Sequence, residues 1–263
     1  MKITVLMENT RAREDVLCEH GLSLYIETAS HKLLFDMGQS DAFAQNAETL
    51  GVDLGLVDTA VLSHGHFDHG GGLARFLALN DKAPVYISRF AFGPYYGEEG
   101  RYIGLDASLE KIPRLVPVGD EMTIDDELSL FTRNASPRPF SADSRGLYEL
   151  QDGKPQTDVF AHEQYLLIRE GARRVLVSGC AHKGVLNLMH WCRPDVLIGG
   201  FHLMNIDAIG EESRTLDQIA DALNAYPATY YTCHCTGAAQ YDALKTRMGE
   251  KLHYLAGGRQ ICV

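Results

Sequence analysis

Short apolar runs and stretches of helical spacing alternate along the chain, which predicts an α/β protein. Residues 1–7, 59–62 and 84–88 are apolar runs of strand length. In the other stretches, apolar positions recur every three or four residues, the spacing of one buried helix face. These predicted helices cover residues 40–50, 72–79, 185–192, 215–225 and 238–248.

Two hairpins and the repeated order of elements indicate how the chain is organised. Residues 23–28 and 32–35 flank an Ala29-Ser30 turn, and residues 164–169 and 173–178 flank Glu170-Gly171. Strands followed by helices occur once in each half, and no linker or short repeat separates them. We therefore predict one domain over residues 1–263, made of two similar halves, with a final strand. Residues 89–120 are rich in Gly, Pro and aromatic side chains, and we expect an irregular excursion there.

Composition and charge narrow the class of protein. The 263 residues are 45% hydrophobic and 22% charged, which allows a large core. A net charge of −11 makes nucleic-acid binding a poor expectation, because such binding needs many Lys and Arg against phosphates. No apolar run approaches the roughly 18 residues of a membrane span. Six cysteines are too few for a disulfide scaffold and no secretory signal is visible, so we expect reduced thiols and a cytoplasmic location.

The segment most informative about chemistry is Ser63–Gly72, SHGHFDHGGG, between a predicted strand and a predicted helix. Imidazole and carboxylate groups are ligands for zinc and similar metals, and glycines allow the backbone to turn tightly between them. A surface loop has no packing use for so many ligands at a strand end. His64 and His66 are placed to face one metal, and Asp68 and His69 a second one nearby.

This His-x-His-x-Asp-His pattern resembles the signature of the metallo-β-lactamase superfamily. The resemblance implies a four-layer αββα sandwich, two sheets packed together with helices outside. It also implies two divalent metal ions, with zinc expected and manganese or iron as alternatives. Relatives that carry a redox di-iron site have Glu where this chain has His66, which favours zinc or manganese.

Further motifs support the resemblance along the chain. The turn Leu34–Gly38 contains Asp36, which such folds use to brace the metal loop; a simple turn residue is the alternative. Ser178–His182, Gly199–Leu203 and Cys233–Gly237 each follow a short apolar strand and would bring a histidine to one sheet edge. Together with Asn9-Thr10, they resemble the subfamily of 7,8-dihydropterin-6-yl-methyl-4-(β-D-ribofuranosyl)aminobenzene 5′-phosphate synthases.

The chain departs from the superfamily pattern at two places. No separate Gly-His loop is evident between residues 120 and 160, so we expect His182 to be the third ligand of the first site, with His162 as the alternative. The usual bridging Asp is replaced by Cys180. A thiolate ligand, a thiol near the metals and a small packing residue are all compatible with the sequence, and we expect Cys180 near the metals.

The remaining histidine motifs and an aromatic segment complete the candidate site. Cys233-His234-Cys235 lacks the second cysteine pair of a zinc finger, so His234 is expected to be a ligand of the second site. His202 is expected to contact substrate or act in catalysis. Residues 89–102 are interpreted either as a lid over the substrate or as a cover for the core. Substrate contacts are expected from Arg101, Tyr102 and Arg138, and Arg145 is a further candidate for a phosphate contact.

These observations predict a dinuclear metal-dependent hydrolase that acts on a phosphorylated or otherwise anionic small molecule. The metals would provide a nucleophile from water, and Asp68 would orient it. A metal-dependent transferase of pterin type that releases diphosphate is the first alternative. A di-iron redox protein and a non-catalytic metal-binding or ligand-binding domain are two others. A tRNA-processing nuclease is disfavoured by the acidic charge balance.

Overall fold

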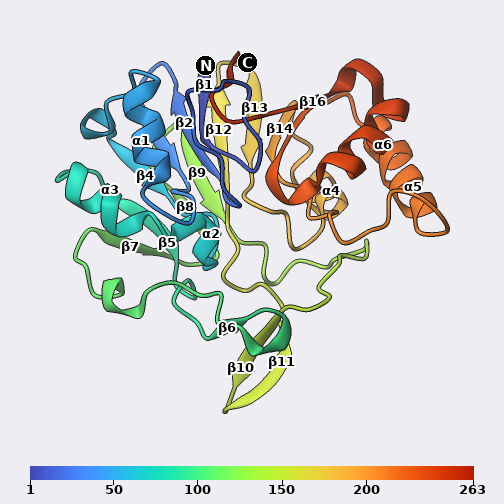
Figure 1. Cartoon of the computed structure of the whole chain (residues 1–263), viewed down its shortest axis with the longest axis horizontal. Coiled ribbons are helices and arrows are strands. Elements are labelled where there is room, and N and C mark those ends of the chain that lie inside the picture. The colour runs from blue at the N-terminus through green and yellow to red at the C-terminus, as the bar shows by residue number, and fades with distance from the viewer.

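The computed structural model describes all residues, 1–263, and contains two seven-stranded sheets (Figure 1). The first sheet has the order β17 (Gln260–Cys262), β1 (Lys2–Met7), β2 (Ser23–Glu27), β3 (Lys32–Phe35), β4 (Thr59–Val61), β5 (Val85–Ser88) and β7 (Leu115–Val118). The second has the order β16 (Leu252–Tyr254), β15 (Thr229–Thr232), β14 (Val196–Gly199), β13 (Arg173–Val177), β12 (Tyr165–Glu170), β9 (Leu128–Phe131) and β8 (Glu121–Thr123).

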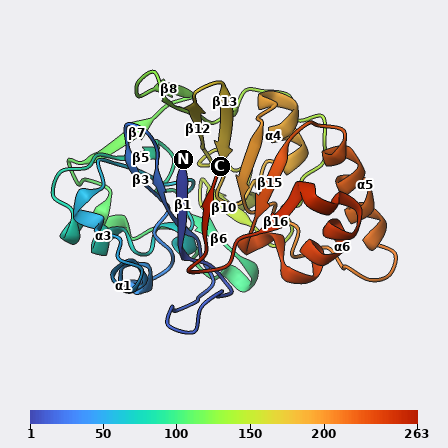
Figure 2. The ribbon, with the colours of Figure 1, turned by 90° about the horizontal axis from the view of Figure 1, so that it is seen from above.

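Helices cover the outer faces of both sheets, which gives the expected αββα layers (Figure 2). On the side of the first sheet lie α1 (Ala42–Thr49) and α3 (Leu73–Leu79). On the side of the second sheet lie α4 (Val185–Cys192), α5 (Ser213–Asn224) and α6 (Ala238–Met248). The short helix α2 (Phe67–Gly70) belongs to the loop that carries the His-rich motif. The predicted four-layer sandwich is confirmed.

Three hydrophobic clusters fill the three spaces between the four layers. Successive strand residues point to opposite faces of a sheet, so each buried strand contributes to two clusters. In β3, Leu33 and Phe35 pack between the sheets, while Leu34 packs toward the helices. In β13, Val175 and Val177 face the first sheet. Each such side chain contributes roughly 1.5–3 kcal/mol when buried, which explains why these strands read as continuous apolar runs.

The parallel strands place their carboxyl ends at one edge of the sandwich. In the first sheet β3, β4, β5 and β7 are parallel, and in the second sheet β13, β14, β15 and β16 are parallel. Ligand sites in α/β proteins form outside such strand ends. The loops after β3, β4, β13, β14 and β15 therefore meet in one region, the lower centre of Figure 1.

The expected irregular excursion over residues 89–120 is only partly correct, because it also contains β7, the last strand of the first sheet. It contains the two-residue strand β6 (Tyr95–Tyr96) as well, which joins β10 (Tyr148–Gln151) and β11 (Lys154–Thr157) in a small third sheet. This third sheet projects beneath the sandwich (Figure 1). None of the helices combines the length and the apolar character needed to cross a membrane.

Candidate metal centre

The His-rich segment runs from the end of β4 through α2, and its side chains are buried. His64, His66, Asp68 and His69 are at most 8% exposed. The backbone must pass very close to a neighbouring loop here, because a Cβ added at Gly65 would lie 2.1 Å from the carbonyl oxygen of Ala91. Glycine is therefore required between the first two histidines, and it allows their rings to lie on the same side of the loop.

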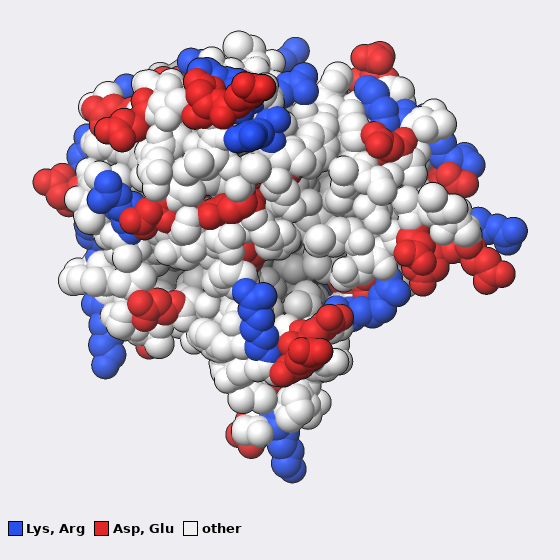
Figure 3. Space-filling view, viewed as in Figure 1, with Lys and Arg blue, Asp and Glu red and all other residues white.

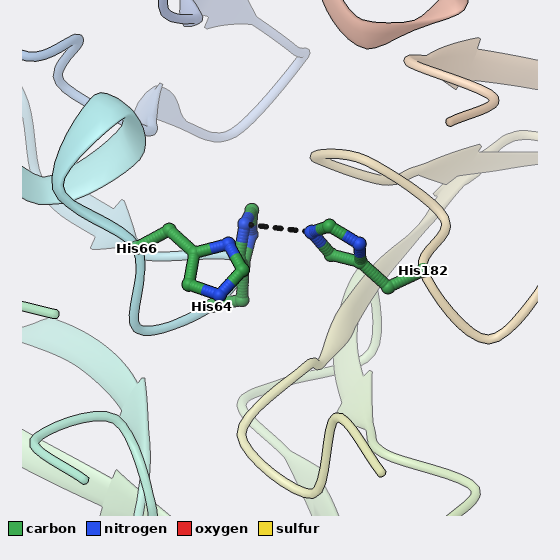
Figure 4. A group of neighbouring side chains, drawn as sticks. All are labelled: His64, His66 and His182. Atoms are coloured by element: carbon green, nitrogen blue, oxygen red, sulfur yellow. Dashed lines mark hydrogen bonds between the residues drawn. The ribbon is translucent and has the colours of Figure 1, made fainter. Parts of the chain in front are cut away.

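Three histidines form a first cluster across the gap between the two sheets. His64 and His66 come from the loop after β4, and His182 comes from the loop after β13 (Figure 4). The Nε2 atoms of His64 and His182 lie 3.3 Å apart. The ligand atoms of all three residues lie within 4.8 Å of one another. The structure thus brings together the three residues that the sequence assigned to the first metal.

A second cluster lies beside the first and contains the expected second-site residues. The Nε2 atoms of His69 and His234 are 3.1 Å apart. One carboxylate oxygen of Asp68 lies 3.3 Å from His234 Nε2 and 3.6 Å from His69 Nε2. These groups come from the β4–α3 loop and from the end of β15, so both sheets contribute to this cluster as well.

Hydrogen bonds fix which nitrogen of His64 faces the site. The Ser63 hydroxyl donates its single hydrogen to Asp36 Oδ2 at 2.7 Å, so it accepts from His64 Nδ1 at 2.8 Å. His64 Nδ1 therefore carries the proton, and its Nε2 lone pair points toward His182. Asp36 also accepts from the Ser63 backbone N–H and from His69 Nδ1. The predicted brace position of Asp36 corresponds to these three hydrogen bonds.

Asn9 and Glu8 hold His234 in the same way. Asn9 Oδ1 accepts from the backbone N–H of Gly21, which identifies it as the oxygen, and it accepts from His234 Nδ1 at 2.8 Å. The buried Glu8 accepts from the backbone N–H of His234 and from the Tyr254 hydroxyl. These contacts direct His234 Nε2 into the site and give the Asn9-Thr10 motif a physical role.

The donor set fits a divalent metal ion. Two nitrogens bound tetrahedrally to zinc at about 2.0–2.1 Å are separated by roughly 3.3 Å, close to the observed Nε2 distances. His66 Nε2 is buried and has no hydrogen-bond partner. A buried polar atom without a partner costs about 1–3 kcal/mol, and a bound cation removes that cost. Nitrogen and oxygen donors in this number are those that zinc or manganese accept.

Electrostatics keep the first cluster neutral and concentrate charge in the second. Burial lowers the pKa of His64 and His182, and together with His162 it lowers the pKa of His66 to about 3. These rings are therefore neutral and able to bind a metal at pH 7. Burial alone raises the pKa of Asp68, but the surrounding His69, His20 and His234 outweigh it and hold the pKa well below its usual range.

His69 lies between two carboxylates, and this explains its different behaviour. Burial lowers the pKa of His69, but Asp68 and Asp36 outweigh it and raise the pKa to about 9. The pair of carboxylates thus attracts positive charge at this position. A metal cation beside Asp68 supplies the same charge.

His162 lies close to the first cluster, but the protein already uses both of its ring nitrogens. Its Nδ1 accepts from the Gly65 backbone N–H at 2.9 Å, and its Nε2 donates to Asp158 at 3.0 Å. His162 therefore supports the metal loop from behind. His182 is held differently, because Glu163 accepts from its backbone N–H.

Cys180 and Cys235 lie beside the second cluster as buried thiols. Cys180 Sγ is 3.2 Å from His69 Nε2, and Cys235 donates to the Cys180 carbonyl oxygen. Burial and the neighbouring Cys235 raise the pKa of Cys180, whereas Cys180 and His202 outweigh burial and lower the pKa of Cys235. The expected position of Cys180 near the metals matches this geometry.

Both clusters open into a cleft of about 660 Å³ that contains further polar side chains. Figure 3 shows this face of the molecule hollowed at its centre, with charged side chains at the rim. Arg101, Arg145 and His202 line the cleft. Tyr102 and Arg138 do not line it: Tyr102 donates to the Leu105 carbonyl, and Arg138 to the Val159 carbonyl. Residues 97–103 form one wall, consistent with the lid interpretation.

His20 is a cleft residue that the sequence did not reveal. Its Nε2 lies 3.3 Å from the Asp68 carboxylate, and its ring centroid is 4.7 Å from that of His234. It belongs to a third group of close metal-binding side chains with Asp68 and His234. No motif surrounds His20, and only the long-range contact between the loop before β2 and the metal loop places it here.

The chain belongs to the metallo-β-lactamase superfamily, since residues 17–202 match the model of that family. The fold and the histidine clusters described above agree with this membership.

Relatives of known sequence or structure extend over almost the whole chain. It is 25% identical to the 7,8-dihydropterin-6-methyl-4-(beta-D-ribofuranosyl)-aminobenzene-5′-phosphate synthase of Methanocaldococcus jannaschii, over 92% of this chain and 90% of the synthase. An uncharacterized protein of the same organism is 28% identical, over 89% of this chain and 90% of its own length. The crystal structure of Tm1679, a metal-dependent hydrolase of the beta-lactamase superfamily, has a TM-score of 0.84 at 27% identity, covering 100% of this chain and 99% of that one.

Proposed function

We propose that this protein is a metal-dependent hydrolase with two divalent metal ions, expected to be zinc, that acts on a phosphorylated or otherwise anionic small molecule. His64, His66 and His182 would hold the first ion. Asp68, His69 and His234 would hold the second. Similarity to Tm1679, a metal-dependent hydrolase, supports the reaction type.

The observation that carries the proposal is the orientation of the buried rings. Hydrogen bonds from Nδ1 to Ser63, Asp36 and Asn9 turn the Nε2 atoms of three histidines toward other candidate ligands: His64 toward His182, and His69 and His234 toward each other. The neutral rings of His64 and His182 place their Nε2 atoms 3.3 Å apart, an arrangement that a cation between them would stabilise. A domain that binds only metal ions would not need the adjoining cleft of about 660 Å³, which has the size of a small-molecule site.

Each group of the chain then has a defined task. When bound, two divalent ions supply Lewis acidity and a nucleophile at neutral pH. Asp68 accepts hydrogen bonds and orients the attacking group, because its carboxylate is ionised and faces the cleft. His202 lines the same cleft, and a ring nitrogen of its side chain would contact the substrate. Arg101 at the cleft wall would bind the anionic group, whereas the Arg145 guanidinium is already paired with Asp143 and Glu212.

A metal-dependent transferase is the second candidate, favoured by the similarity to the pterin phosphate synthase. The same residues would then bind a departing diphosphate, and a second substrate would take the place of water. The two reactions differ in whether oxygen from solvent enters the product.

The location is also part of the proposal. All six cysteines are free thiols, two of them buried beside the metal clusters. Such a set is typical of a reducing compartment, so we propose the cytoplasm.

Hydrolysis of bis(p-nitrophenyl) phosphate and p-nitrophenyl phosphate tests the function. After a chelator has removed the metal, the hydrolysis rate should fall by more than about 100-fold, and added zinc or manganese should restore it. The double variant His66→Ala, Asp68→Ala should stay inactive, while the exposed His190→Ala should behave as wild type. Full activity in the double variant or in the stripped protein would overturn the proposal.

A further inference from the structure

A second hollow adjoins the metal cleft and shares two lining residues with it. A side pocket of about 270 Å³ lies between α4, α5 and the segment 141–145. His202 and Arg145 line both the side pocket and the metal cleft. Ligand sites usually measure about 300–1,000 Å³, so the side pocket has room for part of a ligand, with the rest in the cleft.

The walls of the side pocket are largely apolar and firmly held. The segment before it is tied to α4 by two hydrogen bonds between Phe140 and Asn187. A pocket with such walls favours an uncharged ring over a sugar or a second phosphate. The apolar lining residues are Val185, Leu186, Phe201, Leu203, Ile206 and Ile219.

The charged groups at the rim of the pocket exclude a second anion. Asp143 holds the Arg145 guanidinium at 3.0 Å, and Glu212 lies 3.5 Å from the same side chain. Two carboxylates against one guanidinium leave a formal charge of −1 at this rim. In the metal cleft, by contrast, two divalent ions would attract an anion.

His202 stands at the junction of the two hollows with unused hydrogen-bonding capacity. Both of its ring nitrogens are buried and lack a nitrogen or oxygen partner, so at least one ring nitrogen stays free even where the sulfur of Cys235 interacts with the other. Its ring centroid lies 4.2 Å from that of His182, a residue of the first cluster. The backbone there has a φ of 52°, a conformation that costs energy for any residue except glycine. A half-buried histidine with a free, buried ring nitrogen at such a position points to a ligand that crosses the junction.

We propose that the substrate is an ester or anhydride of phosphate with an uncharged aromatic group: its anionic end lies at the metals, and its ring occupies the side pocket beyond His202. This inference rests on the proposed function and names the substrate class for it. A small diphosphate or an alkyl phosphate would leave the side pocket empty and would bind more weakly.

Two non-hydrolysable probes test the subsite on the zinc-loaded protein by calorimetry. 1-Naphthylphosphonate should bind at least about tenfold tighter than methylphosphonate, because only the naphthyl ring can bury apolar surface in the pocket. Thr215 is exposed on α5 and lines the pocket, so Thr215→Trp should fill the pocket without disturbing the fold. In this variant, the ratio of the two phosphonate affinities should fall to about one. The control Gln218→Trp lies one turn further along the same helix and outside the side pocket, so it should keep the wild-type ratio of affinities.

Each outcome separates the subsite from the proposed function. Equal affinity of the two phosphonates for the wild type would overturn the subsite, as would a preference that survives Thr215→Trp. A third result is that neither phosphonate binds, while uncharged 1-naphthol binds the wild type but not Thr215→Trp. This result would support the aromatic subsite and contradict binding of the anion at the metals. If none of the three probes binds, both proposals fail.

Discussion

At the scale of single residues, the neighbours of each histidine decide what its ring can do. The spacing of His64, His66, Asp68 and His69 was enough to predict which residues meet. It was not enough to predict tautomers, because these depend on partners far away in sequence, such as Asn9 for His234. For the same reason His20 was missed, since only the folded chain brings it to Asp68.

Asp36 provides the clearest test at this scale. In Asp36→Asn, one carboxylate oxygen becomes an amide nitrogen, so the side chain can no longer accept at Oδ1 from the Ser63 backbone N–H and at Oδ2 from the Ser63 hydroxyl and His69 Nδ1 together. We expect zinc affinity to fall about 10–100-fold, because groups that orient metal ligands typically have this effect. The measurement is competition with a chromophoric chelator.

The control for Asp36→Asn is Asp53→Asn, an exposed position where an amide oxygen can still accept from Gly55. Unchanged zinc affinity in Asp36→Asn would show that its three hydrogen bonds do not orient the metal loop.

At the scale of elements, the five longer helices and the strands β1 to β5, β12 and β13 were predicted within a few residues because the chain shows apolar runs or helical spacing there. The strands β10 and β11 were not predicted, because their side chains are largely exposed and show no hydrophobic alternation. β7 was not predicted either, because Pro117 is unfavourable within a strand. The proline is tolerated because β7 is an edge strand. The division into two similar halves stays a prediction.

The tight passage of the metal loop beside residue 91 leads to a prediction for Gly65. In Gly65→Ala, the new Cβ would clash with the Ala91 carbonyl, a backbone atom that cannot move alone. We expect a loss of about 1–3 kcal/mol in the free energy of unfolding, together with weaker zinc binding. Urea unfolding with and without zinc measures both effects.

Gly119→Ala is the matched control, since no atom lies within 4 Å of its added Cβ and its φ is not positive. Equal unfolding free energies for Gly65→Ala and Gly119→Ala would mean that the loop adapts without cost.

At the scale of the whole molecule, ionic contacts join the two sheets at their far ends. His31, in the turn between β2 and β3, contacts Asp58 and also Asp125 before β9. Burial lowers the pKa of His31, but the two carboxylates outweigh it and raise the pKa above its usual value. Protonated His31 thus links the first sheet to the second.

This link predicts a pH-dependent stability. Because the folded pKa of His31 is raised, its contribution is complete below the unfolded value of about 6.5 and is lost as pH rises through the folded value. The loss of unfolding free energy in His31→Ala should therefore be larger at pH 6 than at pH 9. The difference should be about 0.5 kcal/mol, since solvent screens this partly exposed group. A loss independent of pH would show that packing, and not charge, is what His31 contributes.

The central claim, that the converging histidines hold two metal ions, is tested most directly by counting metals per chain with plasma mass spectrometry. The protein should be purified without chelator, as wild type, His182→Ala, His234→Ala and the exposed His190→Ala. We expect two divalent ions in the wild type and in His190→Ala, and close to one in each of the other two variants. Less than one ion in the wild type, or two ions retained in both His182→Ala and His234→Ala, would contradict the account.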